Sequence, residues 1–363
     1  MRAKKYPVLL MVMPSLMYAQ DVKIAGNIDV SIPQSEYRVT TPQSKVSPSI
    51  RSIHLLKLQL SASAKELLEG RLNKGLQSNQ IMTASSATGK NVQLGMGNVP
   101  VLDQGAFGTC VTFAVTAAID AALNKGDYVS QLCSLQLGRY LENNAYTPSG
   151  WEGSWSSYVI NQFDAFGLVN KINQQQVGCG GVNKYPLNSI SDVPGTEMTP
   201  EQYHAISESL PNGDDGTLLY WTSILDVPQV FLEKPNMDQV LSQVKSSLDN
   251  KSRLTFGVVL PGVYLGLAGA VGKYHQASDT WVVTPEVINA LDNDEDLAGH
   301  EMVITGYNDD AIAIDNHGVA HKGLLTLRNS WGDKVADKGN FYMSYAYFKA
   351  LVLEAKRITM ATE

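Results

Sequence analysis

At residues 104–110 the chain reads Gln104-Gly105-Ala106-Phe107-Gly108-Thr109-Cys110, a glycine-interrupted loop that ends in a single cysteine. The run that follows, residues 111–123, has the length of a helix and is apolar on nearly every side, which is typical of a buried helix. Asn124-Lys125-Gly126 then ends it with a polar turn and a glycine. We therefore expect Cys110 at the N-terminus of a buried helix, where backbone N–H groups and the helix dipole favour a thiolate.

Two interpretations of Cys110 fit this loop when it is taken alone. Cys110 is either a nucleophile or a core cysteine that happens to begin a helix, since buried free cysteines are common. Two downstream motifs favour the nucleophile. His300 stands near the head of an apolar, β-prone run at residues 299–307, and a second such run ends in Asn329-Ser330-Trp331-Gly332.

Together the three motifs resemble those of the papain-like cysteine peptidases: a Q-G-x-x-G-x-C loop, then G-H-x-x-x-x-x-G-Y, then N-S-W-G, in the order Cys, His, Asn. The resemblance covers roughly residues 96–350, strongly at the motifs and loosely between them. It implies an α+β, two-lobed papain-like fold, with Cys110 on a helical lobe and His300 and Asn329 on an antiparallel, barrel-like β lobe. It also implies hydrolysis of peptide bonds through a thioester acyl-enzyme, without a cofactor or a metal.

The resemblance assigns a role to each residue of the candidate site. Gln104 stands six positions before Cys110, where the family places the glutamine that donates a hydrogen bond to the developing oxyanion. His300 would take the thiol proton and later protonate the leaving amine. Asn329 would orient the imidazole, and Trp331 would shield their hydrogen bond from water. A solvated loop glutamine is the alternative reading of Gln104.

The loop departs from the family pattern at three positions. Phe107 stands where a disulfide cysteine is usual, Thr109 replaces a serine or alanine, and Val111 replaces an aromatic residue. The first change removes a familiar disulfide, and none of the three removes a catalytic group.

Substrate contacts are expected at Gly153, Ser154 and Trp155, which resemble the glycine-containing strand that pairs with the peptide backbone. Trp155 would form a wall of the second specificity pocket; a Gly-Ser loop with a core tryptophan is the alternative. Glu301 replaces a small residue directly after His300. If its side chain points into the cleft, it would favour a basic or polar side chain two residues before the scissile bond.

The other two cysteines, Cys133 and Cys179, are an even pair once Cys110 is set aside. In an exported protein such a pair suggests one disulfide, with two free thiols as the alternative. His300 follows Cys110 by 190 positions and Asn329 follows His300 by 29. The first distance exceeds that of typical relatives, so we expect loop insertions, at about residues 188–229 and 272–298, whose role the sequence does not reveal.

Elsewhere in the catalytic part, pattern and cap residues predict four further elements. They are helices at residues 130–143 and 236–248, a helix start at Thr199-Pro200, and a strand at residues 254–260.

Residues 1–19 read as a signal peptide. Three basic residues precede a short apolar core, and Ala19 is a suitable last residue before cleavage. A membrane anchor is the weaker interpretation, because the apolar stretch is too short to span a bilayer. We expect export to a periplasm or to the outside of the cell, and no stable membrane span.

Residues 20–90 are read as a pro-segment with a linker, and residues 91–363 as the catalytic domain. Residues 22–24 and 28–32 flank Ala25-Gly26-Asn27 and suggest a hairpin, and residues 53–60 suggest a strand. Ser63 and Glu66 then read as a capping box that opens a short helix toward Gly75. Papain-like enzymes are typically made as zymogens, so this mixed hairpin-plus-helix segment is expected to cover the cleft. A permanent accessory module is the alternative.

The sign of the net charge changes near the boundary between the expected pro-segment and the expected catalytic domain. Residues 1–19 carry +3 and residues 20–95 carry +4, which leaves −14 for residues 96–363 within a total of −7. Opposite charges of this kind guide docking of the pro-segment on the catalytic domain. Acid should loosen that contact by neutralising carboxylates of the acidic domain. An acidic main domain also argues against nucleic acid as a partner.

Two clusters could suggest a metal, and neither fits well. The acidic run at residues 292–296 lacks the glycine and the terminal glutamate of a calcium loop. Asp315, His317 and His321 surround Asn316-His317-Gly318, which reads better as an exposed hairpin turn.

The expected partners are peptide or protein substrates and the chain's own pro-segment. An endopeptidase is favoured; an exopeptidase or a catalytically silent peptide-binding homologue is the alternative.

Overall fold

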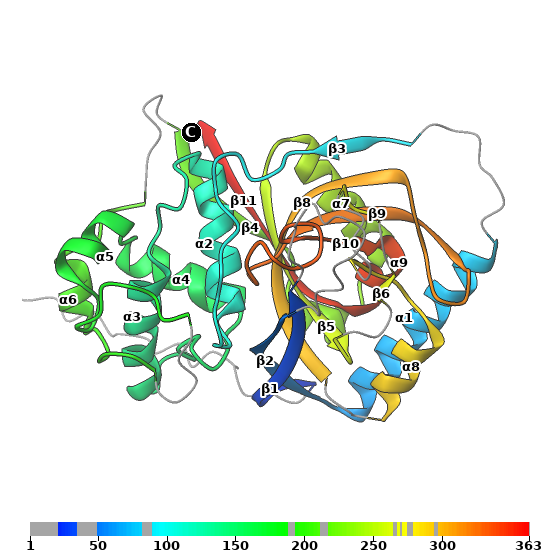
Figure 1. Cartoon of the computed structure of the whole chain (residues 1–363), viewed down its shortest axis with the longest axis horizontal. Helices are drawn as coiled ribbons and strands as arrows, with labels where there is room; N and C mark the ends of the chain where they lie inside the picture. Colours follow the sequence, from blue (N-terminus) through cyan, green and yellow to red (C-terminus); the bar gives the residue numbers. More distant parts are fainter. Residues whose placement is uncertain are drawn as a thin grey trace, which may run out of the picture.

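A computed structural model of the chain describes residues 21–34, 49–81, 89–187, 193–210, 217–263, 267–268, 271–273, 279–293 and 297–362. The expected signal peptide, residues 1–19, lies outside the described residues. Figure 1 shows a helical lobe beside a lobe built around a large sheet, which is the α+β, two-lobed arrangement that the motifs predicted. Within the described residues, no helix is both long enough and apolar enough to cross a membrane.

The helical lobe is organised around α2, which begins at Cys110 and ends at Leu123 as the sequence predicted. Every residue from Cys110 to Ala121 is buried, and Asn124 ends the helix in the left-handed conformation. The remaining helices of this lobe are α3 (Gln131–Asn143), α4 (Ser156–Phe166), α5 (Lys171–Val177) and α6 (Pro200–His204).

The second lobe is a sheet in which the strand order is β4-β11-β5-β8-β9-β10-β7-β6, with β2 (Ser49–Leu60) and β3 added along β8. Among the described pairs, all are antiparallel except β10 with β7. The strands are β3 (Asn91–Gln93), β4 (Thr217–Leu225), β5 (Arg253–Pro261), β6 (Leu267–Ala268), β7 (Thr280–Trp281), β8 (Leu297–Ile314), β9 (Ala320–Arg328), β10 (Asn340–Ser344) and β11 (Val352–Thr362).

Helices α7 (Met237–Asp249), α8 (Pro285–Asp292) and α9 (Tyr345–Leu351) pack on this sheet, and a π-helical turn, η2 (Gln229–Glu233), precedes α7. The predicted helices at residues 130–143 and 236–248 and the predicted strand at residues 254–260 are confirmed by α3, α7 and β5. Thr199 caps α6 through a full capping box with Pro200 in the first turn, as predicted.

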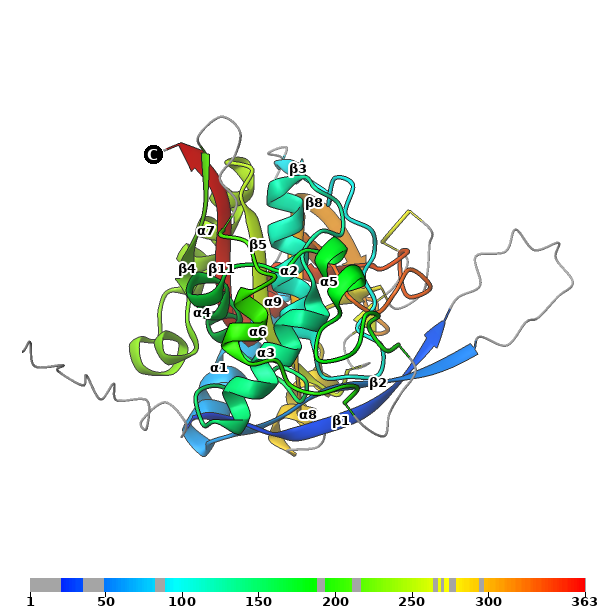
Figure 2. The same ribbon diagram turned by 90° about the vertical axis from the view of Figure 1, so that its left-hand side faces the viewer.

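The N-terminal segment forms a long hairpin that runs along the lower side of the molecule in the view of Figure 2. Strands β1 (Val22–Gln34) and β2 (Ser49–Leu60) pair from Val22 with Leu60 to Gln34 with Ser49. The predicted turn at residues 25–27 is wrong. Gly26, at a φ of +120°, lies in a register shift between Ile24 and Asn27, so the chain bulges and continues as one strand.

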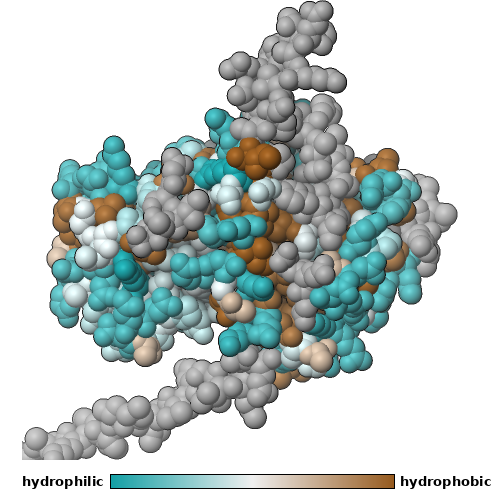
Figure 3. Space-filling model, turned by 60° about the horizontal axis from the view of Figure 1, so that its bottom comes forward, coloured by the Kyte–Doolittle hydropathy of each residue, from teal (hydrophilic) through white to brown (hydrophobic). Residues whose placement is uncertain are grey.

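Helix α1 (Ala62–Ile81) also differs from its prediction. The Ala64 backbone N–H donates to Ser61 Oγ, so the N-cap is Ser61 and not Ser63. The helix does not stop at Gly75 but continues to Ile81, and Gly75 lies against Ala346 and Val283 of the second lobe. The side of the molecule that carries the hairpin is brought forward in Figure 3, where hydrophobic residues form a band near the middle.

Candidate active site

Cys110 lies at the boundary between the lobes, with its side chain completely buried. The backbone N–H groups of Glu301, Val111 and Cys110 itself point at the sulfur, and these contacts lower the thiol pKa. Burial is the larger effect and raises the pKa of Cys110 to about 12. Cys110 is therefore a neutral thiol here and not the expected thiolate, because the cost of burying the thiolate charge exceeds its stabilisation by the backbone N–H groups at the helix N-terminus.

His300 lies on β8, and its imidazole is held by a hydrogen-bonding contact and by a contact with an aromatic ring. Its Nε2 lies 2.8 Å from Asn329 Oδ1, and its ring stacks on Trp331 at a centroid distance of 4.7 Å. Nδ1 is buried and has no hydrogen-bond partner among the described residues. Burial lowers the pKa of His300 to about 4, although the hydrogen bond with Asn329 acts in the opposite direction. The imidazole is thus neutral at pH 7.

Gln104 ties the cysteine loop to the loop that follows β9. Its backbone N–H donates to the Ser330 carbonyl at 2.8 Å, and Ser330 Oγ donates to its side-chain Oε1 at 2.8 Å. Asn329 directly precedes Ser330 in the chain. His300 directly precedes Glu301, whose backbone N–H points at the Cys110 sulfur. The structure therefore brings Cys110, His300, Asn329 and Gln104 to one place between the lobes.

Strand β2 lies across this place. Its backbone pairs with β8 at Leu56 with Gly299 and at Lys57 with Ala298, directly before His300. The Leu56 side chain covers Gly153 so closely that a Cβ on that glycine would lie 2.2 Å from Leu56 Cδ2. Gly153 has a φ of +119°, so glycine is required there for its backbone as well.

Polar contacts fix the hairpin beside the site. Arg51 donates to both carboxylate oxygens of Asp103, each at 2.6 Å, and Asp103 also accepts from the Gly105 backbone N–H at 2.9 Å. A bidentate pair of this kind is among the stronger ionic contacts in proteins. Asn27 Nδ2 donates to the Glu152 carboxylate on the helical lobe.

Glu301 is buried rather than exposed in a cleft. Its carboxylate accepts from Ser156 Oγ at 2.6 Å, while the Ser156 backbone N–H donates to Glu354 at 2.9 Å. Burial, and then the proximity of Glu354, raises the pKa of Glu301 well above its ordinary value. A protonated carboxyl offers no charge to a basic side chain, and this carboxyl faces Ser156 and Glu354, so the condition that Glu301 points into an open cleft is not met here.

Trp155 and Ser154 lie where the helical lobe meets the sheet. Ser154 is buried, whereas Trp155 is half-buried and precedes α4 in an extended conformation. A pocket of about 330 Å³ opens beside Trp155, and β1 of the hairpin closes one side of it. Its lining includes two acids that the sequence did not single out, Asp226 and Glu354.

Tyr185 is a site residue that sequence reasoning missed. Its hydroxyl donates to the Gln104 carbonyl at 2.7 Å and lies 2.9 Å from Thr109 Oγ1, so it joins both ends of the cysteine loop. Its ring stacks on Trp151 at 5.9 Å, and Trp151 meets Phe107 edge-on at 5.0 Å. These ring contacts surround Phe107, which stands where the family resemblance leads us to expect a disulfide cysteine. No motif in the sequence marks Tyr185, because its aromatic partners become neighbours only in the folded chain.

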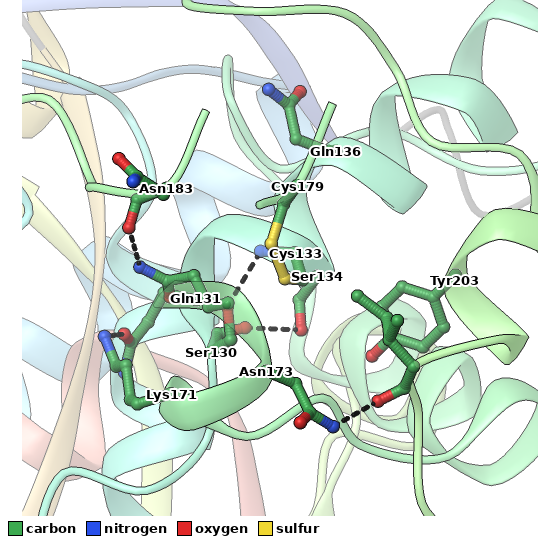
Figure 4. The surroundings of a disulfide bond; sticks show 12 residues. Ser130, Gln131, Cys133, Ser134, Gln136, Lys171, Asn173, Cys179, Asn183 and Tyr203 are labelled. Carbon is green, nitrogen blue, oxygen red and sulfur yellow. Dashed lines mark hydrogen bonds between the residues drawn. A yellow bond between two sulfur atoms is a disulfide. The ribbon is translucent and has the colours of Figure 1, made fainter. Parts of the chain in front are cut away.

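The helical lobe contains a disulfide between Cys133 on α3 and Cys179, as the sequence suggested (Figure 4). Ser130 caps α3 by accepting from the Cys133 backbone N–H at 3.0 Å and donates to Gln174 at 2.7 Å. The bridge therefore joins α3 to the segment after α5. Cys110 is a free thiol.

The described part of the chain contains no group of three His, Cys, Asp or Glu side chains that could hold a metal ion. His321 contacts Asp315 at 2.9 Å, and His317 instead contacts Glu286 at 2.6 Å. Residues 316–318 form the turn between β8 and β9, as predicted.

Comparison with solved structures returns cysteine proteases at low identity. Xylellain, a cysteine protease from Xylella fastidiosa, is 17% identical over 76% of this chain and 87% of its own, with a TM-score of 0.46. Digestive procathepsin L 3 of Tenebrio molitor larval midgut is 15% identical over 82% and 79%, with a TM-score of 0.43. The bromelain protease from Ananas comosus, in complex with the E64 inhibitor, is 15% identical over 74% and 95%, with a TM-score of 0.40.

No curated protein sequence matches the chain. The Peptidase C1-like family matches residues 270–358, the part that carries His300 and Asn329. The match covers about a quarter of the chain, and with the two-lobed fold and the order of Cys110, His300 and Asn329 it makes the chain similar to the papain-like cysteine peptidases.

Proposed function

We propose that the chain is an exported cysteine endopeptidase, made as a zymogen, in which the β1–β2 hairpin occupies the substrate cleft until it is removed. The main observation in support of peptidase activity is the 2.8 Å contact between His300 Nε2 and Asn329 Oδ1. It holds the imidazole with Nε2 as the donor and leaves Nδ1 available to accept a proton from the Cys110 thiol.

The proposed reaction proceeds in two halves. His300 Nδ1 accepts the thiol proton while Cys110 Sγ attacks the carbonyl carbon, and the oxyanion accepts hydrogen bonds from Gln104 Nε2 and the Cys110 backbone N–H. The C–N bond then breaks, His300 returns the proton to the leaving amine, and a thioester remains. Water, deprotonated by His300, cleaves the thioester and restores the thiol.

The position of β2 supports the zymogen. Leu56 covers Gly153, the glycine expected to pair with substrate, and pairs with Gly299 beside His300. The Gln104 side-chain nitrogen donates to the Phe107 carbonyl at 2.9 Å and lies 3.5 Å from the His54 carbonyl. A peptide substrate needs the same surfaces, so it competes directly with the hairpin.

Removal of the hairpin would also change the ionisation of the site. The buried Cys110 and His300 are both neutral here, with pKa values of about 12 and about 4. Access to water would lower the first and raise the second, because both shifts come mainly from burial. The hairpin is thus proposed to block the cleft and to keep the nucleophile protonated.

An epoxysuccinyl probe for cysteine peptidases tests this function. We expect labelling of Cys110 in protein freed of its hairpin, no labelling of Cys110→Ser, and slow labelling of the intact chain. If the freed protein binds peptides yet never reacts, the chain is a catalytically silent homologue. Release of internal fragments or of terminal residues from a peptide library distinguishes an endopeptidase from an exopeptidase.

Export is proposed from residues 1–19, and the Cys133–Cys179 disulfide fits an oxidising compartment. N-terminal sequencing of the secreted form tests it and locates the maturation cut. Preference for a basic side chain two residues before the scissile bond is proposed to depend on Glu301, in an enzyme whose Glu301 carboxyl has become accessible and ionised. Equal cleavage of Arg and Leu there, unchanged in Glu301→Ala, would remove that role.

A further inference from the structure

Helix α1 shares its hydrophobic core with the β lobe. Leu68 and Leu72 are completely buried and belong to the same cluster as Val283, Val287 and Phe348. At Gly75 the helix lies against the second lobe, where an added Cβ would make an ordinary contact of 3.4 Å with Ala346 Cβ. Arg71 reaches the Val230 carbonyl at 3.5 Å. Helix α1 thus packs mainly against α9 and α8.

The hairpin and α1 occupy different places relative to the site. Strand β2 lies over the surfaces that a substrate needs, at Gly153 and Gly299. Helix α1 lies on the side of the β lobe away from the helical lobe, beside α8 and α9 (Figure 1). Access to Cys110 therefore requires the hairpin to move, but it does not require α1 to leave.

Loss of α1 would expose a large apolar surface. The core that Leu68 and Leu72 share with the lobe includes Val283, Val287 and Phe348, each completely buried in the intact chain, and α1 packs against α8 and α9. Contiguous apolar surfaces of this kind destabilise a domain or promote association.

We infer that α1 is a permanent part of the β lobe, and that the face formed by α8 and α9 is an interaction surface whose partner is residues 62–81 of the same chain. A cut between α1 and β3 then yields a two-chain protein in which α1 stays bound. The inhibitory role of the hairpin rests on the proposed function, whereas the retention of α1 does not.

The test uses the full chain with a recognition site for a site-specific protease in place of residues 83–88. After cutting, size-exclusion chromatography and mass spectrometry report whether the N-terminal fragment co-elutes with residues 89–363. We expect at least nine-tenths of it to remain. Loss of the fragment from a protein that stays folded, monomeric and unchanged in Tm would overturn the inference.

Two variants separate the hairpin from the helix as the cause of retention. Arg51→Ala/Leu56→Ala weakens the hairpin, so we expect the cut protein to react faster with the probe and still to retain its fragment. Release of the fragment by this variant would show that the hairpin alone holds it. A complete lack of labelling, with the fragment retained, would instead contradict the proposed peptidase and leave α1 unaffected.

The second variant, Leu68→Ala/Leu72→Ala, removes two completely buried side chains of α1. We expect its Tm to fall by about 5–10 °C and the fragment to dissociate after cutting. Asn73→Ala, at an exposed position on the same helix, is the matched control and should change neither. A double variant that behaves like Asn73→Ala would contradict the inference.

Discussion

The backbone carbonyl oxygen of His54 lies 3.5 Å from the side-chain nitrogen of Gln104. A main-chain carbonyl from the N-terminal hairpin thus faces the donor that, in the proposed mechanism, binds the oxyanion of a substrate. The hairpin presents to the site the same chemical group that a substrate would present. This relationship makes the strength of hairpin binding measurable through the reactivity of Cys110.

Arg51→Ala should speed labelling of the intact chain by the epoxysuccinyl probe about fivefold. The variant loses two charge-assisted hydrogen bonds to Asp103 that are partly exposed, and about 1 kcal/mol is the corresponding loss in hairpin binding. Lys57→Ala, on the same strand and exposed, is the control and should leave the rate unchanged. Equal rates for all three proteins would show that this ion pair does not hold the hairpin.

Gln104→Ala should lower kcat/KM of the freed enzyme about 10²–10³-fold, the usual effect of losing one oxyanion donor. Because Gln104 also bonds to Ser330, part of the loss could come from a shifted loop. Ser330→Ala removes the same bridge and keeps the donor, so its kcat/KM should fall less than about tenfold. Matching losses in the two variants would assign Gln104 a structural role.

Acid should destabilise the intact chain through His300. Its folded pKa of about 4 lies below the ordinary 6.5, so the stability it contributes is full above pH 6.5 and is lost as the pH falls toward 4. Between pH 7.5 and 4.5 this amounts to about 2.5 kcal/mol. Urea unfolding of Cys110→Ser and Cys110→Ser/His300→Gln, which avoids self-cleavage, should show that difference, and parallel pH curves would contradict it.

Tyr185→Phe should lower kcat about tenfold with little change in KM. The variant keeps the ring that stacks on Trp151 but loses the hydroxyl that joins Gln104 to Thr109. Unfolding free energy should fall by about 1 kcal/mol. An unchanged kcat with reduced stability would mean that the hydroxyl supports the fold and does not position the cysteine loop.

The candidate site was predictable because its chemistry lies in short motifs. Cys110, His300, Asn329 and Gln104 each stand in a run whose local sequence predicts its own element, and the sheet needed only to bring β8 and β9 together. The expected start and end of α2 were correct for the same reason, since an all-apolar run with a polar last turn has few alternatives.

The N-terminal segment was predicted less well because its structure depends on distant partners. Gly26 reads as a turn residue, yet pairing with β2 makes it a bulge. Gly75 reads as a helix stop, yet it lies inside α1 and against Ala346 of the β lobe. Tyr185 lies 75 positions after Cys110 and in no motif, so only the folded chain reveals its contacts with the cysteine loop.

The loop that ends in Cys110 is anchored by the ring contact of Phe107 with Trp151 and by the hydroxyl of Tyr185. A cysteine nucleophile must be kept reduced to react, whereas a structural disulfide beside it must stay oxidised. Here aromatic packing holds the nucleophile's loop, and the Cys133–Cys179 bridge joins other segments of the helical lobe. The described contacts that anchor this loop therefore include no disulfide, so a reductant that keeps Cys110 as a thiol does not break them.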